Sequence, residues 1–308
     1  MKYTTIFKGN PESDLLNIFA SNPIDILSLS LDDPPELLTE FVKNYDGKFL
    51  AGFISYEYGV KQLGVPVHNL NDFPAVHFRV YDSFEKNIQL EEPKNIDWDE
   101  FESTLIKSEY DSGFEKIQNH IRSGDFYQIN FTHSLKSKTK ASPKELFLKL
   151  RGKNQVGYSV FMEHNDWAIH SLSPEQFIKI ENQIITTKPI KGTFPRGQSQ
   201  EEDNYNLKSL LNSEKEQAEL YMIIDLLRND LGKICKTGSV QVLQSKSIQK
   251  LEKVFHTFGV VQGELKSNLH PVEALLSMSP GGSISGCPRG QMFLRRGIGA
   301  QSTATHQR

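Results

Sequence analysis

A lysine near the middle of the chain is the residue best suited to covalent or acid–base chemistry. Lys191 lies in the segment TKPIKGT (187–193), directly after a strand-like run over 183–187. We expect the flanking proline and glycine to form a turn that carries this lysine. In a tight, desolvated site a lysine amine can act as a nucleophile, a base or an anion clamp. Local spacing alone favours the plainer alternative, an exposed turn lysine.

Two further side chains are candidates for proton transfer. Glu175 comes just before a predicted hairpin whose second strand leads to Lys191, so both residues can flank one end of a sheet and work as a pair. His256 lies in a predicted strand over 253–265. The residues alone leave open an exposed turn glutamate and a histidine packed inside a sheet.

Two carboxylates suggest a metal site. Glu216 and Glu219 stand three residues apart in a predicted helix, so both point to the same side of it. Mg²⁺ usually takes one or two carboxylates together with water and an anionic ligand. The alternative is a solvated helix face.

The segment 281–286 consists mostly of small residues, with Gly282, Ser283 and Gly286 among them. Its backbone N–H groups can form an anion-binding nest, although its spacing matches neither common phosphate loop. The alternative is a flexible loop.

Strands outnumber helices in the predicted element order and rarely alternate with them. This pattern favours an α+β fold with largely antiparallel sheets. The predicted helices cover 34–42, a segment opened by a capping box at Ser112, a segment from Pro143, and 201–231 with a break near Ser213 and an end at Gly232. The predicted strands are 49–56, 75–81, 125–133, 157–162, 167–171, a hairpin over 177–187, 239–243 and 253–265.

Composition narrows the functional classes. The 308 residues are 37% hydrophobic and 24% charged, with a net charge of −3, which is typical of a globular protein and argues against a nucleic-acid partner. We expect no membrane span and no secretion signal. Two cysteines, Cys235 and Cys287, are too few for a disulfide framework. The expected location is the cytoplasm.

Six ordered motifs resemble those of the chorismate-utilising enzymes. They are GDFYQIN (124–130), SPE (173–175), PIKGT continuing to Arg196 (189–196), IDLLRNDLG (224–232), GSV (238–240) and PGGSISG (280–286). The resemblance implies the family's α+β fold, with large antiparallel sheets packed face to face and helices outside. It also favours functional roles for the candidate residues over the plainer alternatives.

Within this family, the residue after Pro-Ile is usually lysine in the aminodeoxychorismate synthase large subunit and alanine in the anthranilate synthase large subunit. The resemblance therefore implies that Lys191 attacks chorismate at C2 while Glu175 assists departure of the C4 hydroxyl. Ammonia from a glutamine amidotransferase subunit would then add at C4, giving 4-amino-4-deoxychorismate for folate synthesis. His256 resembles a site histidine near the ring.

The resemblance also implies binding groups. Glu219, with Glu216 as a weaker candidate, would hold Mg²⁺. Gly192 and Thr193 would contact substrate, and the 281–286 segment would contact a substrate carboxylate. The alternative functions are anthranilate synthase and a non-catalytic fragment that at most binds the amidotransferase partner.

The resemblance divides the chain into three parts. It is weak over 1–110, strong over 111–289 as an incomplete catalytic domain, and absent over 290–308, where the sequence has no helical period. We therefore expect that a frameshift or early stop has replaced the C-terminal part of the family pattern. Such a loss would remove further metal ligands and a substrate-binding arginine.

Overall fold

The computed structural model describes residues 3–10, 13, 15, 17–67, 73–91, 95–125, 127–153 and 156–287. The chain forms two compact units that divide between Pro174 and Glu175, and the second unit ends at Cys287. The domain boundaries predicted at 110 and 289 stay a prediction. The tail over 290–308 lies outside the described residues.

The first unit contains two antiparallel sheets and a short strand pair. One sheet has the order β11-β10-β1-β2-β6, made of Ala168–Ser173, Tyr158–Glu163, Thr4–Lys8, Ile18–Ser21 and Glu85–Lys86. The other has the order β3-β5-β4, made of Asp25–Leu29, Val76–Tyr81 and Phe49–Ile54. The short pair is β7 (Glu102–Ser103) with β9 (Leu135–Lys136). The remaining elements are α1 (Glu36–Asn44), α2 (Tyr56–Gln62), α3 (Lys107–Arg122), α4 (Pro143–Lys153) and β8 (Gln128–Ile129).

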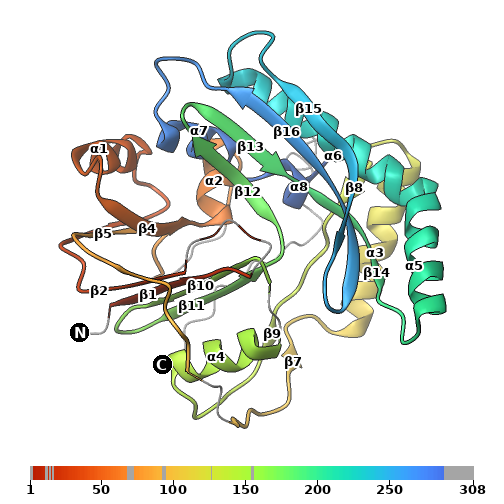
Figure 1. The fold of residues 1–308 in the computed structure, drawn as a ribbon, viewed down its shortest axis with the longest axis horizontal. Coiled ribbons are helices and arrows are strands. Elements are labelled where there is room, and N and C mark those ends of the chain that lie inside the picture. Colours follow the sequence, from red (N-terminus) through yellow and green to blue (C-terminus); the bar gives the residue numbers. More distant parts are fainter. Residues whose placement is uncertain are drawn as a thin grey trace. The chain divides into compact units, whose positions relative to one another are not determined.

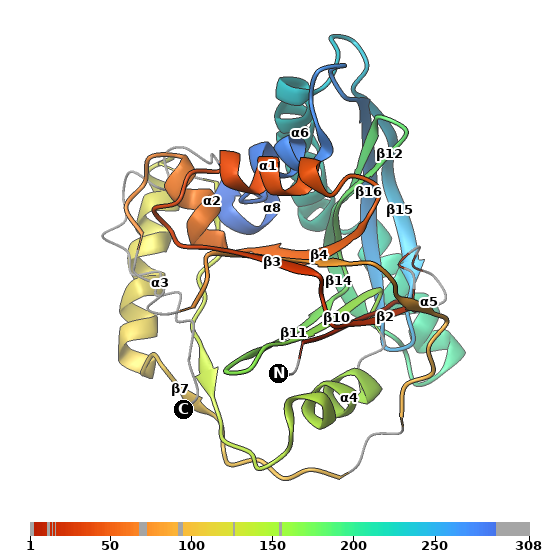
Figure 2. The ribbon, with the colours of Figure 1, turned by 90° about the vertical axis from the view of Figure 1, so that its left-hand side faces the viewer.

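The two sheets of this unit pack face to face. Ala20 and Met162 of one sheet share a buried cluster with Ala51 and Tyr81 of the other. On the opposite face of the larger sheet, Phe147 of α4 is fully buried among apolar strand side chains. Figure 2 shows the resulting layers, with α1 above the smaller sheet and α4 below the larger one. This arrangement confirms the predicted α+β fold with antiparallel sheets between helices.

The second unit is a sheet supported by a long helix. Its strands are β12 (Gln176–Glu181), β13 (Ile184–Lys188), β14 (Ile190–Pro195), β15 (Gln241–Lys250) and β16 (Val254–Glu264). The long β16 pairs antiparallel with β13, β14 and β15. The helices are α5 (Gln200–Asn212), α6 (Glu214–Ile234), α7 (Pro271–Met278) and α8 (Gly282–Ser285), and β17 (Gly286–Cys287) follows.

Helix α6 lies along the sheet of the second unit (Figure 1) and contributes half of the residues in the buried cluster between them. Its residues Leu220, Ile223 and Leu227 are buried against Ile185 of β13 and Val261 of β16. Fully burying such side chains contributes about 1.5–3 kcal/mol each. This core fixes which face of α6 packs against the sheet. Other residues on that face of α6 are therefore also held close to the sheet.

Three predicted element boundaries are wrong. The helix expected from Ser112 begins at Lys107, where the Glu109 side chain accepts a hydrogen bond from Ile106 N at 3.2 Å. The predicted end at Gly232 lies inside α6, since Leu231 and Ile234 are buried and their packing outweighs the low helix propensity of glycine. The strand expected over 125–133 is reduced to β8; Phe131 instead stacks on Tyr110 of α3, with ring centroids 5.2 Å apart.

The start of α6 gives a modest stability prediction. Ser213 caps this helix by accepting a hydrogen bond from Glu216 N. Ser213→Ala should lower the free energy of unfolding by about 1 kcal/mol, because the first turn loses a partner for one of its N–H groups. Urea denaturation would measure the loss. Ser245→Ala, at an exposed position of β15, is the control; equal stability of the two variants would contradict the prediction.

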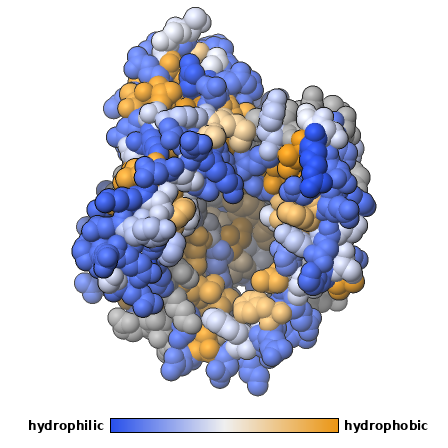
Figure 3. All heavy atoms as spheres, turned by 90° about the vertical axis from the view of Figure 1, so that its right-hand side faces the viewer, coloured by the Kyte–Doolittle hydropathy of each residue, from blue (hydrophilic) through white to orange (hydrophobic). Residues whose placement is uncertain are grey.

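The face shown in Figure 3 is mostly hydrophilic, with apolar groups interspersed. Among the described residues, no helix combines the length and apolar character needed to cross a bilayer.

Candidate active site

Lys191 lies in a strand, so the predicted turn is wrong. Both β13 and β14 pair with the single long strand β16, and Pro189 makes only a short interruption between them. The Pro189 carbonyl accepts a hydrogen bond from Gly259 N at 3.1 Å, which keeps the two strands on the same ladder. The backbone around Lys191 is therefore held by a sheet, and the position of its side chain is better defined than in a turn.

A bulge at Gly192 shapes the strand next to this lysine. The register with β16 shifts between Lys191 and Thr193, and Gly192 has φ = 77°, in the left-handed region that favours glycine. A Cβ at Gly192 would lie 2.8 Å from Thr257 Oγ1 and 3.2 Å from Glu216 Cβ. The missing side chain thus allows α6 to approach the strand, and it brings Glu216 beside the bulge.

Helix α6 also supplies a direct partner for the lysine. Glu219 Oε1 lies 3.3 Å from Lys191 Nζ, and the two side chains are 26% and 15% exposed. Glu216 precedes Glu219 by one helical turn on the same side of α6. The structure thus places Glu219 in contact with Lys191, and Glu216 beside the neighbouring Gly192.

Glu175 lies directly before β12 and belongs to the same group. Burial raises the pKa of the Glu175 carboxyl above its usual value. The positive charge of Lys191 and hydrogen bonds from the Ile190 backbone and the Ser283 side chain act in the opposite direction. A carboxyl group of this kind remains protonated to higher pH than an exposed one, which suits a proton donor.

His256 is a packed histidine near the start of β16. It is 8% exposed, and its Nδ1 lies 2.8 Å from Thr193 Oγ1. Burial lowers the pKa of His256, while a hydrogen bond to the Gly192 backbone opposes this shift. These contacts attach the imidazole to both residues that follow Lys191. A direct catalytic role for His256 stays a prediction.

The small-residue segment after α7 is not the loop that the sequence predicted. Residues Gly282–Ser285 form the short helix α8, and Gly286 begins β17. A Cβ at Gly282 would lie 2.5 Å from Leu226 Cδ2, so this glycine is needed for close packing against α6. Contacts of Gly192, Thr193, Gly282, Ser283 and Gly286 with a substrate stay predictions.

The expected Mg²⁺ site would depend on the carboxylates of α6. Within the described residues, no group of three or more His, Cys, Asp or Glu side chains is close enough to hold a metal ion. Glu216 and Glu219 nevertheless offer two carboxylates one turn apart on one face of α6. Mg²⁺ commonly binds with so few protein ligands when water and an anion complete the shell. The chemistry of the two residues therefore fits this ion.

Two contacts in the site were missed by sequence reasoning. Thr257 is paired with Lys191 across the strands, is 1% exposed, and donates its hydroxyl proton to the Lys191 carbonyl. The threonine directly after His256, between two phenylalanines of this strand, was the available indication. The contact between Ser283 and Glu175 joins residues more than one hundred positions apart, and no local pattern predicts it.

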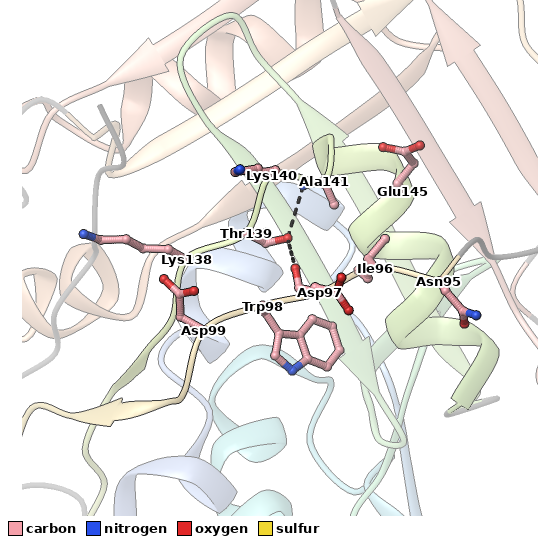
Figure 4. A pocket seen from close by; sticks show the side chains of 10 residues that line it. All are labelled: Asn95, Ile96, Asp97, Trp98, Asp99, Lys138, Thr139, Lys140, Ala141 and Glu145. Atoms are coloured by element: carbon pink, nitrogen blue, oxygen red, sulfur yellow. Dashed lines mark hydrogen bonds between the residues drawn. The ribbon is translucent and has the colours of Figure 1, made fainter.

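A separate cavity of about 650 Å³ lies in the first unit, with all its lining residues in 95–99 and 138–145. Thr139 Oγ1 donates to the Asp97 carbonyl at 2.7 Å and accepts from Ala141 N at 3.1 Å (Figure 4). Trp98 lies along the same wall. None of the predicted site residues lines this cavity.

Comparison with known proteins places these residues in context. The family model described as chorismate binding enzyme matches residues 26–293. Aminodeoxychorismate synthase component 1 of Salmonella typhimurium is 36% identical over 189 residues, which cover 61% of this chain and 42% of that protein. Anthranilate synthase component 1 of Pseudomonas putida is 34% identical over 190 residues, covering 62% of this chain and 38% of that protein. The matched stretch thus spans less than half the length of these curated relatives.

Solved structures share the fold. Anthranilate synthase component I from Streptococcus pneumoniae has a TM-score of 0.76 at 24% identity, covering 93% of this chain and 77% of that chain. The menaquinone-specific isochorismate synthase MenF from Escherichia coli has a TM-score of 0.71 at 14% identity, covering 96% of this chain and 72% of that chain.

Proposed function

Because this chain belongs to the chorismate binding enzymes, we propose that it acts as component 1 of an aminodeoxychorismate synthase. In this proposal it converts chorismate and ammonia to 4-amino-4-deoxychorismate and water. The observation that supports it most is a lysine 3.3 Å from a helix carboxylate, with a buried carboxyl group of raised pKa in the same cluster. A lysine and an acid are the two groups that such a substitution requires.

In the first step, the neutral amine of Lys191 forms a bond to C2 of the ring. The two ring double bonds shift, the C4–O bond breaks, and Glu175 gives its proton to the departing hydroxide, which leaves as water. The nitrogen of the adduct is then cationic and Glu175 is a carboxylate, so charge and protons balance.

In the second step, ammonia forms a bond to C4 and the double bonds shift back. The bond between C2 and Lys191 breaks, and the lysine leaves as a neutral amine. The new ammonium group returns a proton to Glu175, which restores both residues. The strand pairing and the Glu219 contact hold the lysine in place for both steps.

Glu219, together with Glu216, would hold Mg²⁺, which when bound supplies positive charge for a carboxylate of the substrate. Glu219 would then contact Lys191 and, through the ion, help to orient the substrate carboxylate.

Ammonia would come from a glutamine amidotransferase subunit. The relatives named component 1 imply a second component. We propose a partner of that class for this chain as well.

The alternative within the family is anthranilate synthase, since component 1 of that enzyme is similar at nearly the same identity. Purified chain with chorismate, Mg²⁺ and ammonium salt decides between them. We expect 4-amino-4-deoxychorismate by mass spectrometry. Anthranilate as the product would overturn the assignment, and no product from a folded chain would support the non-catalytic fragment.

The protonation of Glu175 gives a pH prediction. The acid must carry its proton to assist departure, and burial raises its pKa. Turnover at a fixed concentration of free NH₃ should therefore fall as pH rises through this raised pKa. Glu175→Gln, which cannot donate that proton, should have low activity at every pH and no such decline. If turnover of Glu175→Gln fell with rising pH as in the wild type, the fall would be due to a group other than Glu175.

A further inference from the structure

The short helix α8 is wedged between the hairpin and α6. A Cβ at Gly281 would lie 2.9 Å from Phe177 Cε2 of β12, and one at Gly282 would lie 2.5 Å from Leu226 Cδ2 of α6. Contacts this close leave no space for a side chain at either position unless the neighbour moves. The two glycines therefore set the position of the next residue, Ser283.

Ser283 bonds to the acid of the site. Its side chain makes a hydrogen bond with the Glu175 carboxyl, which also accepts a bond from the Ile190 backbone. Phe177, against which Gly281 packs, follows Glu175 by two residues. The same packing that seats α8 therefore brings the hydroxyl and the carboxyl together, and two donors restrict rotation of the carboxyl group.

A hydroxyl group has only one proton to donate. While that proton is engaged by Glu175, it is not available for a substrate carboxylate. We infer that Ser283 is a positioning residue that orients the Glu175 carboxyl for proton donation, and that it is not a substrate-carboxylate contact. The inference rests on the proposed role of Glu175 as the acid.

The first test does not require turnover. The chain is labelled with ¹³C at glutamate carboxyl groups, and the Glu175 resonance is assigned as the one lost in Glu175→Gln. In Ser283→Ala the titration of Glu175 should move to higher pH by roughly half to one pH unit, because a donor that stabilises the carboxylate is lost. Ser283→Thr keeps the hydroxyl and should restore the original titration.

Equal titration of Glu175 in wild type and Ser283→Ala would overturn the inference. This result is distinguishable from failure of the proposed function, since a chain without product formation still reports the Glu175 titration. The control is Ser277→Ala on α7, whose exposed hydroxyl bonds only its own helix at Glu273 O; it should leave the titration unmoved.

The second test separates orientation of the acid from substrate binding. Ser283→Ala should lower kcat by about tenfold and leave KM for chorismate nearly unchanged, because only the acid is misplaced. The decline of kcat at high pH should move with the Glu175 titration. A tenfold rise in KM with that decline unmoved would assign Ser283 to the substrate carboxylate instead, and would overturn the inference.

Discussion

Lys191→Ala is expected to abolish formation of 4-amino-4-deoxychorismate, with kcat falling by roughly 10³-fold or more. The physical reason is that the substitution removes the atom that would form the bond to C2, and the carboxyl groups that remain in the cluster cannot replace an amine nucleophile. The measurement is product formation with chorismate, ammonia and Mg²⁺. Mass spectrometry of acid-quenched wild-type protein should also detect a covalent adduct that is absent in the variant.

The control for this experiment is Lys179→Ala. Lys179 lies on β12 and forms an ion pair with Glu181 at 3.0 Å, with both side chains exposed. Exposed pairs of this kind contribute little to stability, so this variant should keep its activity. Retained turnover in Lys191→Ala would contradict covalent catalysis by this residue and favour direct attack of ammonia on the substrate.

Gly192→Ala is expected to destabilise the second unit strongly. Gly192 has φ = 77°, and a Cβ there would meet Thr257 Oγ1 at 2.8 Å, Leu210 Cδ1 at 3.0 Å and Glu216 Cβ at 3.2 Å. The left-handed backbone costs about 1–2 kcal/mol for alanine, and overpacking costs about 1–3 kcal/mol more. We expect a total loss of about 2–5 kcal/mol in the free energy of unfolding, measured by urea denaturation.

Gly238→Ala is a matched control for this loss. Gly238 has φ = 80°, and a Cβ there would have no neighbour within 4 Å. It should therefore show only the backbone cost, about 1–2 kcal/mol. A loss in Gly192→Ala no greater than that in Gly238→Ala would show that the contacts with α5, α6 and β16 relax freely, and that the bulge does not fix the distance between helix and strand.

The local patterns in the sequence were sufficient for most elements. Strand-like runs predicted β4, β5, β10 and β11, with clear alternation in β5, and the serine before Glu214 marked the break between α5 and α6. These predictions succeeded because period, caps and turns act between neighbouring residues. The helix end predicted at Gly232 was wrong because contacts distant in sequence decide it. Burial of Leu231 and Ile234 by strands far along the chain makes the helix continue past Gly232.

For the site, the sequence by itself determined the residue types, the family and the face of α6 on which both glutamates lie, since these depend on order and spacing alone. Only the tertiary structure decided the contacts. Pairing of β13 and β14 with one long β16 turned an expected turn into a strand, and placed Thr257 behind Lys191. The close approach allowed by Gly192 and Gly282 brought α6 and α8 to the carboxyl and amine groups. Such contacts join residues far apart in the chain, and their geometry depends on packing that no local spacing encodes.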